Sequence, residues 1–192
     1  MTHFSDILRI CLLYEHGGVW LDSTVLLTAP LRSLPQICRQ LGFWTPKDDG
    51  NILERCFKAR NWIVRENKWV TFCIYVSKNN ILAEFLCTLF FMYVKSKNIF
   101  IDYFLFDYFI SIAYDTLPEI RITIDSVPEN NPKIHEMLHR LTLNSEYNPI
   151  AFENICKDTF FHKLNWKEDF KEYTETGNLT NYGYIINNFP PV

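Results

Sequence analysis

Two adjacent glycines, Gly17 and Gly18, separate a helix-like segment from an apolar run in the stretch "YEHGGVWLDSTVLLT". Residues 4–16 carry apolar side chains at helical spacing, which predicts an amphipathic helix. A glycine after the last helical residue is typical of a left-handed stop, so the helix is expected to end at Gly17. Residues 19–21 then predict a short buried strand that turns back against the helix and ends on the carboxylate of Asp22.

The composition is that of one folded domain. The chain has 192 residues, of which 48% are hydrophobic, enough to bury roughly 70% of the surface of the unfolded chain. The net charge is −3 and no basic stripe occurs, which argues against nucleic acid as a partner. The cysteines show no CxxC pair and most lie in apolar runs, which is typical of reduced, buried thiols in a cytoplasmic protein. They are Cys11, Cys38, Cys56, Cys73, Cys87 and Cys156.

The apolar runs are unsuited to crossing a membrane. Residues 85–94 are too few to span a bilayer, and residues 99–113 include Asp102 and Asp107. The first residues lead directly into a helical pattern, without the pattern of a signal peptide. We therefore expect a cytoplasmic protein with at most peripheral contact at the inner face of the membrane.

The rest of the chain alternates between strand and helix patterns. Strand patterns occupy residues 25–28, 40–45, 68–77 and 121–124. Helix patterns occupy residues 80–94, 103–114, 133–143 and 149–157. This order predicts the α/β or α+β class, with one body over residues 1–167. Residues 168–192 are more polar and are expected to form a loosely held tail.

Asp6 and Arg9 lie three residues apart, so they share one face of the first helix. An ion pair at this spacing is common on helix surfaces and contributes only a few tenths of a kcal/mol. A second interpretation is a site, because Asp22 stands at a strand end, where open α/β sheets bind ligands. In that case Asp6, Arg9, Trp20 and Asp22 would converge on one crevice. The residues alone leave both interpretations open.

The same residues resemble a known family. The pattern S-D-x-x-R followed by G-G-[VIMF]-[WY]-[LI]-D is similar to the donor-site signature of GT-A glycosyltransferases. The branch that it resembles most is the capsular polysaccharide synthesis proteins, related to the initiating-mannosyltransferase and clostridial-toxin glycosyltransferase families. The segments "WLDSTVLLT", "FIDYFLFDYFI" and "FHKLNWK" resemble the capsular branch in the same order. The resemblance covers roughly residues 2–167.

The resemblance implies a role for each matching residue. Asp6 and Arg9 would hold hydroxyls of the donor sugar, and Trp20 takes the aromatic position next to the donor. Asp22 is the first acid of the DxD motif and would be the catalytic residue that holds a divalent cation, Mn²⁺ or Mg²⁺, against the donor diphosphate. Such a cation stabilises the negative charge that grows on the leaving nucleoside diphosphate.

Two further positions belong to this implied donor site. Thr24 replaces the second acid of DxD, so the motif reads Asp-Ser-Thr and offers one carboxylate rather than two. Lys163 lies in the late segment that folds over the diphosphate in related enzymes, where a cation suits a leaving phosphate.

The implied function is transfer of a sugar from a nucleotide-sugar donor to a growing glycan or lipid-linked acceptor, with retention of configuration. The implied fold is a partial GT-A, Rossmann-like fold, because the nucleotide-binding strands of the resembled enzymes would precede Met1. Such a chain is expected to expose an unpaired sheet edge and apolar helix faces.

Alternatives remain from other classes. A non-catalytic remnant or interaction protein is consistent with Thr24 and with the missing strands. The segment "HEMLH" matches a zinc-hydrolase motif, in which His135 and His139 would bind zinc and Glu136 would act as the base. Asp107 is a candidate for an acceptor role, and Asp102 for a helix N-cap.

Overall fold

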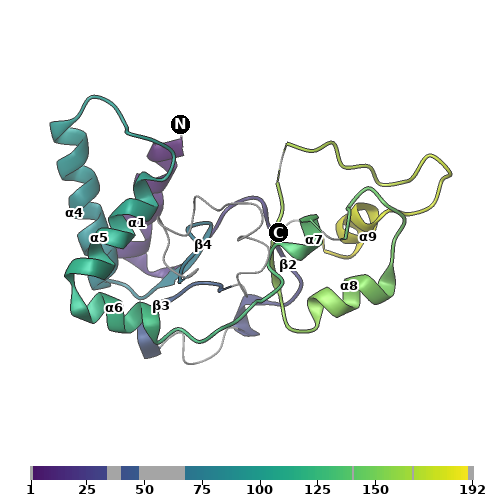
Figure 1. Ribbon diagram of the computed structural model, residues 1–192, viewed down its shortest axis with the longest axis horizontal. Coiled ribbons are helices and arrows are strands. Elements are labelled where there is room, and N and C mark those ends of the chain that lie inside the picture. The colour runs from purple at the N-terminus through teal and green to yellow at the C-terminus, as the bar shows by residue number, and fades with distance from the viewer. Residues whose placement is uncertain (1, 34–39, 48–67, 140, 166, 190–192) are drawn as a thin grey trace. The chain divides into compact units, whose positions relative to one another are not determined.

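The computed structural model describes residues 2–33, 40–47, 68–139, 141–165 and 167–189. These residues form a mixed α/β structure with small sheets (Figure 1). The chain divides into two compact units, which are described separately below. Unit 1 comprises Met1–Leu21 and Leu34–Pro128, and unit 2 comprises Asp22–Ser33 and Glu129–Val192.

Unit 1 contains an antiparallel sheet in the order β1-β4-β3. The strands are β1 (Gly18–Leu21), β3 (Phe43–Trp44) and β4 (Cys73–Val76), and Gly18 pairs with Val76. The helices of this unit are α1 (Thr2–His16), α4 (Ile81–Ser96), α5 (Leu105–Thr116) and α6 (Pro118–Asp125). The helix predicted over residues 4–16 and the strand predicted over residues 19–21 are confirmed.

The predicted reversal at Gly17 has a clear steric cause. Gly17 has a φ of +68°, and its N–H donates to the carbonyl of Leu13 at 2.8 Å, which closes the last turn of α1. A Cβ at Gly17 would lie 2.5 Å from the backbone nitrogen of Lys78, so no larger residue fits there. The close approach sets β1 beside β4, and Asp22 directly follows the last residue of β1.

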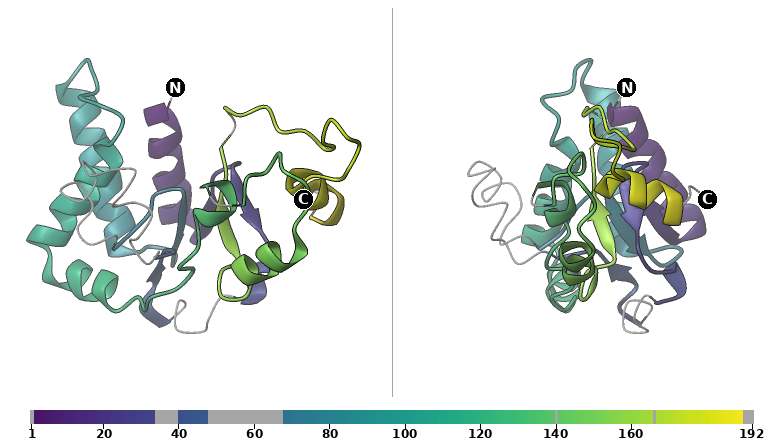
Figure 2. Two further views of the ribbon diagram at one scale, coloured as in Figure 1. Left: turned by 45° about the vertical axis from the view of Figure 1, so that its right-hand side comes forward. Right: turned by 90° about the vertical axis from the view of Figure 1, so that its right-hand side faces the viewer.

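The core of unit 1 lies between the helices and the sheet. Helices α1, α4 and α5 pack against one another, as Figures 1 and 2 show. Phe90 of α4 packs edge-on against Phe109 of α5, with ring centroids 4.9 Å apart. The N-cap of α4 is Asn80, whose side chain accepts hydrogen bonds from the backbone N–H groups of Leu82 and Ala83.

Unit 2 is built around a two-stranded antiparallel ribbon. Its strands are β2 (Val25–Leu27) and β5 (Phe161–Lys163), and it also holds η1 (Leu31–Ser33), α7 (Glu136–His139), α8 (Pro149–Cys156) and α9 (Asn181–Asn188). Val25 pairs with Lys163 in this ribbon. Its hydrophobic cluster joins α7, α8 and α9 through Met137, Leu141, Leu143, Phe152, Ile155 and Ile185.

Three local predictions are wrong. Residues 121–124 belong to helix α6 rather than to a strand, because Ile120 and Ile124, four residues apart, are both buried while Ile122 is 65% exposed. The helix predicted over residues 133–143 is limited to the single turn of α7. Asp102 is not the N-cap of α5; Phe104 is, and the Asp102 carboxylate accepts a hydrogen bond from its N–H at 2.7 Å.

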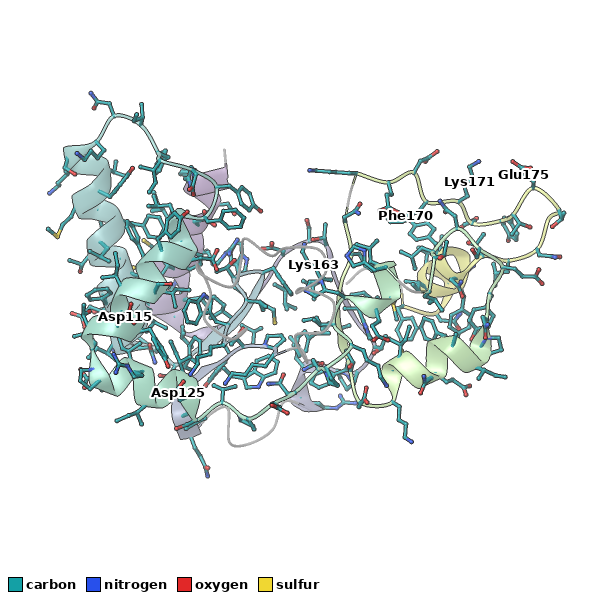
Figure 3. The ribbon with its side chains drawn as sticks, viewed as in Figure 1. Asp115, Asp125, Lys163, Phe170, Lys171 and Glu175 are labelled. Atoms are coloured by element: carbon teal, nitrogen blue, oxygen red, sulfur yellow. The ribbon has the colours of Figure 1, made fainter. Side chains whose placement is uncertain are left out.

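Residues 168–189, predicted to form a loosely held tail, make side-chain contacts within unit 2. Phe170, labelled in Figure 3 with Lys171 and Glu175, stacks on Tyr182 at 5.1 Å. The Thr180 hydroxyl accepts a hydrogen bond from the N–H of Gly183 and so caps α9, whose Ile185 is buried. This segment therefore contributes a helix to the core of unit 2.

The described cysteines fit the expectation of free thiols. Cys73 and Cys87 are buried, and Cys11 and Cys156 are partly buried; Cys38 and Cys56 lie outside the described residues. Within the described ranges, no helix combines the length and the apolar character that crossing a membrane requires.

Candidate functional site

Arg9 lies in a buried cluster of unit 1 that includes one carboxylate and two aromatic rings, here called the Arg9 cluster. Its guanidinium carbon is 5.0 Å from the ring centroid of Trp20 on β1 and 5.4 Å from that of Phe106 on α5. The guanidinium also donates to the backbone carbonyl of Thr71. These contacts fix the head group of Arg9 through cation–π and hydrogen-bond interactions.

Asp6 joins the Arg9 cluster from the preceding turn of α1. One Asp6 carboxylate oxygen lies 3.5 Å from a guanidinium nitrogen of Arg9, and the other lies 3.6 Å from Nδ1 of His3. Asp6 and Arg9 are each only 6% exposed. A surface ion pair between helix turns is solvated, so this burial argues against the surface interpretation of the pair.

A second buried carboxylate lies on α5, next to Phe106 in the sequence. Asp107 is 6% exposed, and its Oδ1 accepts a hydrogen bond of 3.2 Å from Nε1 of Trp69. This contact gives Asp107 a place in the core of unit 1. Its suggested acceptor role stays a prediction.

Asp22, Ser23 and Thr24 form a tight turn at the start of unit 2. The N–H of Val25 donates to the carbonyl of Asp22 at 2.9 Å, so the turn leads directly into β2. Asp22 and Thr24 are partly buried, and Ser23 is exposed. The side chain of Ser23 therefore points to solvent more than those of its two neighbours in the turn.

Lys163 comes to this turn from the other strand of the ribbon. Its Nζ donates a hydrogen bond to Oγ1 of Thr24, and the N–H of Leu164 donates to the carbonyl of Thr24 at 2.8 Å. The pairing of Val25 with Lys163 sets this contact, which joins residues 139 positions apart in the sequence. An ammonium group thus lies beside Thr24, the third residue of the Asp-Ser-Thr motif, where DxD has its second acid.

His162, next to Lys163, faces the interior of unit 2. It is fully buried, and its Nε2 lies 3.1 Å from the hydroxyl of Thr28 and 3.9 Å from Sγ of Cys156. Burial lowers the pKa of His162 to about 4, although a backbone contact at Thr159 opposes the shift. His162 is therefore neutral near pH 7, and Lys163 carries the positive charge of this strand end.

The residues predicted for the site fall into two groups. Unit 1 brings Asp6, Arg9 and Trp20 together, and unit 2 brings Thr24 and Lys163 together. Asp22 begins unit 2, whereas Asp6 and Arg9 belong to unit 1. The prediction that these three converge on one crevice stays a prediction.

The sequence did not predict Phe106 and Thr71, which also contact Arg9 in this cluster. Phe106 lies inside the segment "FIDYFLFDYFI", so the family resemblance could have identified it as a candidate site residue. Thr71 contributes only its carbonyl, and a backbone contact leaves no signal in residue types.

The histidines of "HEMLH" lie on the short helix α7 and the residue before it. Their ring centroids are 6.3 Å apart, and the N–H of His139 donates to the carbonyl of His135 at 3.1 Å. In the part of the chain that the structure describes, no group of three or more His, Cys, Asp or Glu side chains could hold a metal ion.

One known protein family matches almost the whole chain. The model of the capsular polysaccharide synthesis protein family matches residues 1–184, which include both groups of site residues. The chain belongs to this family. As a capsular polysaccharide synthesis protein it has a role in polysaccharide biosynthesis. The search of curated proteins gave no match, and neither did the search of solved structures.

Proposed function

We propose that this capsular polysaccharide synthesis protein is a GT-A-type glycosyltransferase that moves a sugar from a nucleotide-sugar donor to a growing glycan. The observation that carries the proposal is the hydrogen bond from Lys163 to Thr24. The family resemblance implies a donor-site role for both residues, which lie in separate segments of the sequence. Their contact supports the assignment, because a chance resemblance of two distant segments would not be expected to place them together.

In unit 2, the turn would act on the donor diphosphate. Asp22 would hold a divalent cation, and Lys163, oriented by the Thr24 hydroxyl, would bind a phosphate oxygen. The protein donors suit such a cation only in part, since the motif offers one carboxylate. Mg²⁺ commonly binds one or two carboxylates together with substrate phosphates, so the donor would complete the shell. When bound, the cation would stabilise the charge of the leaving diphosphate.

In unit 1, the Arg9 cluster would act on the sugar. The Asp6 carboxylate accepts and the Arg9 guanidinium donates hydrogen bonds, so the pair matches the mixed donor and acceptor character of sugar hydroxyls. Trp20 adds an aromatic face. Retention of configuration is proposed with the family resemblance and rests on it alone.

The first test substitutes the turn in the chromosomal gene and measures surface polysaccharide, with protein abundance followed by immunoblot. Asp22→Ala should abolish polysaccharide, because the carboxylate is the strong cation ligand of the motif. Thr24→Ala should reduce it far less, and Ser23→Ala, at the exposed middle position, serves as the matched control. Equal losses for Asp22→Ala and Ser23→Ala at normal abundance would contradict the proposal.

The second test uses purified protein with UDP- and GDP-sugars and Mn²⁺, and measures the released nucleoside diphosphate. Lys163→Met should lower the rate by at least tenfold, and Lys163→Arg should retain part of it. Lys133→Met is the control, since Lys133 pairs with Asp158 elsewhere in unit 2. A non-catalytic interaction protein would release no diphosphate and would be insensitive to all three substitutions.

A further inference from the structure

Residues of helices α1 and α4 of unit 1 line an open hollow of about 460 Å³. Cys11 and Glu15 line it from α1, and Glu84 and Cys87 line it from α4. Neither thiol takes part in the proposed donor chemistry. The proposed function therefore does not explain why two cysteines lie together at this hollow.

The two thiols are already in contact. Sγ of Cys87 donates to Sγ of Cys11 at a distance of 3.8 Å, and neither sulfur is in a disulfide. The sulfurs of a disulfide lie roughly 2.05 Å apart, so the bond requires rotation of the two side chains that brings the sulfurs closer. The open hollow beside them leaves room for that rotation and for a small oxidant.

We propose that Cys11 and Cys87 form a thiol modification site, which a hydroperoxide converts into a disulfide between α1 and α4. The site is distinct from the donor residues, although it shares helix α1 with Asp6 and Arg9.

The reaction balances with hydrogen peroxide as the oxidant. The Cys11 thiolate attacks one peroxide oxygen, the O–O bond breaks, and the products are a sulfenic acid and water after proton transfer. The sulfur of Cys87 then attacks the sulfenic sulfur, forms the S–S bond and displaces a second water. Two thiols lose two electrons and two protons in total, and one peroxide is reduced to two waters.

The order of attack follows from the surroundings of each thiol. Cys11 is partly exposed, whereas Cys87 is 9% exposed. Burial raises the pKa of the Cys87 thiol to about 12, and the neighbouring Cys11 adds to the shift. Because the thiolate is the nucleophile, Cys11 is the first to react and Cys87 resolves the sulfenic acid.

The sequence makes the product easy to identify by mass spectrometry. Trypsin cleaves after Arg9 and Arg32 and after Lys78 and Lys95, so each cysteine lies alone in its peptide. Reduced protein is treated with hydrogen peroxide, alkylated and digested without reductant. The expected product is the peptide of residues 10–32 linked to that of residues 79–95, and dithiothreitol should release both. Recovery of the two peptides unlinked, as thiols or as higher oxides, overturns the proposal.

Two variants test the order of attack, and a third is the control. In Cys87→Ser, dimedone should label Cys11, because its sulfenic acid can no longer be resolved. In Cys11→Ser, labelling of Cys87 should be at least tenfold lower. Cys156→Ser, altered in unit 2, should form the link at the wild-type rate. Preferential labelling of Cys87 would overturn the assignment of Cys11 as the attacking thiol.

Discussion

The buried polar groups of the two units differ in charge. In unit 1 they include three side chains of the acidic and guanidinium types, Asp6, Arg9 and Asp107. Those described in unit 2 are amides, hydroxyls and imidazoles, namely Asn131, His135, Thr159, His162, Thr180 and Asn181.

The comparison distinguishes buried polar groups that stabilise the fold from buried charged groups that the fold does not require. The amide oxygen of Asn131 accepts hydrogen bonds from the N–H groups of Phe160 and Phe161 at 2.9 and 3.0 Å, which would otherwise be buried unpaired. A buried ion pair has no such necessity, because apolar residues of similar size often stabilise a protein at least as well. Arg9 also donates to the backbone carbonyl of Thr71, and the proposed binding role supplies a further reason for the burial of the Asp6–Arg9 pair.

The largest expected effect comes from breaking the charged pair. Arg9→Met leaves the Asp6 carboxylate buried without the guanidinium, so the free energy of unfolding should fall by about 3–5 kcal/mol. Denaturant unfolding measures the loss. The neutral double variant Asp6→Asn with Arg9→Met should regain most of the stability and still lack donor turnover. A double variant that turns over nucleotide sugar would remove the functional interpretation of the pair.

The next effect tests the neutral side of the comparison. The pKa of His162 is about 4 in the folded protein and about 6.5 in an unfolded chain. Above pH 6.5 the ring is neutral in both states and the stability is complete. As the pH falls from 6.5 to 4 the unfolded state binds the extra proton, so stability is lost, up to about 3 kcal/mol.

The measurement is the free energy of unfolding against pH for wild type and His162→Gln, because the difference removes the titration of the carboxyl groups. His139→Gln, at an exposed position of α7, is the control and should follow the wild-type curve. A wild-type curve that matches His162→Gln between pH 4 and 6.5 would show that His162 is not buried as a neutral group.

The elements next to Gly17 could be predicted because their signals are local. The helical spacing before Gly17 and the apolar run after it act within a few residues, and the structure follows them. The error at residues 121–124 is also local. Alternating Ile and Thr favour a strand, but Pro118 at the first turn and the buried spacing of Ile120 and Ile124 favour a helix, and packing decided between them.

The sequence predicted roles for the site residues, but it did not predict the contacts between them. The resemblance pointed to Thr24 and Lys163 separately, but their contact depends on the register of β2 with β5. The same holds for Phe106, which reaches Arg9 through the packing of α5 against α1. Such pairings join distant segments, and no periodicity in a single sequence encodes them.

A smaller effect is expected from a buried amide that serves the fold. The side chain of Asn181 accepts a hydrogen bond from the N–H of Asn148 at 3.0 Å and donates to the carbonyl of Leu141 at 3.2 Å. Asn181→Ala leaves these groups unpaired and should cost about 2 kcal/mol in denaturant unfolding. Asn187→Ala, at an exposed position of the same helix, should cost less than about 0.5 kcal/mol. Equal costs would mean that burial does not set the contribution of these amides.

The smallest effect is expected from an ion pair of unit 1 that is not buried. Nζ of Lys68 lies 2.6 Å from Oδ1 of Asp125, closer than Arg9 lies to Asp6, but the two side chains are 20% and 40% exposed. Burial opposes the charged form of each group, yet their mutual hydrogen bond and those with Tyr114 outweigh it and raise the pKa of Lys68 while lowering that of Asp125.

Good geometry in a solvated pair still contributes little, because water competes for both charges and the long side chain of Lys68 loses freedom. Lys68→Met should therefore lower the free energy of unfolding by less than about 1 kcal/mol and leave donor turnover unchanged. The same denaturant titration as for Arg9→Met measures it, so the two pairs are compared under one condition. If Lys68→Met costs as much as Arg9→Met, burial is not what distinguishes the Asp6–Arg9 pair, and its burial no longer supports a binding role.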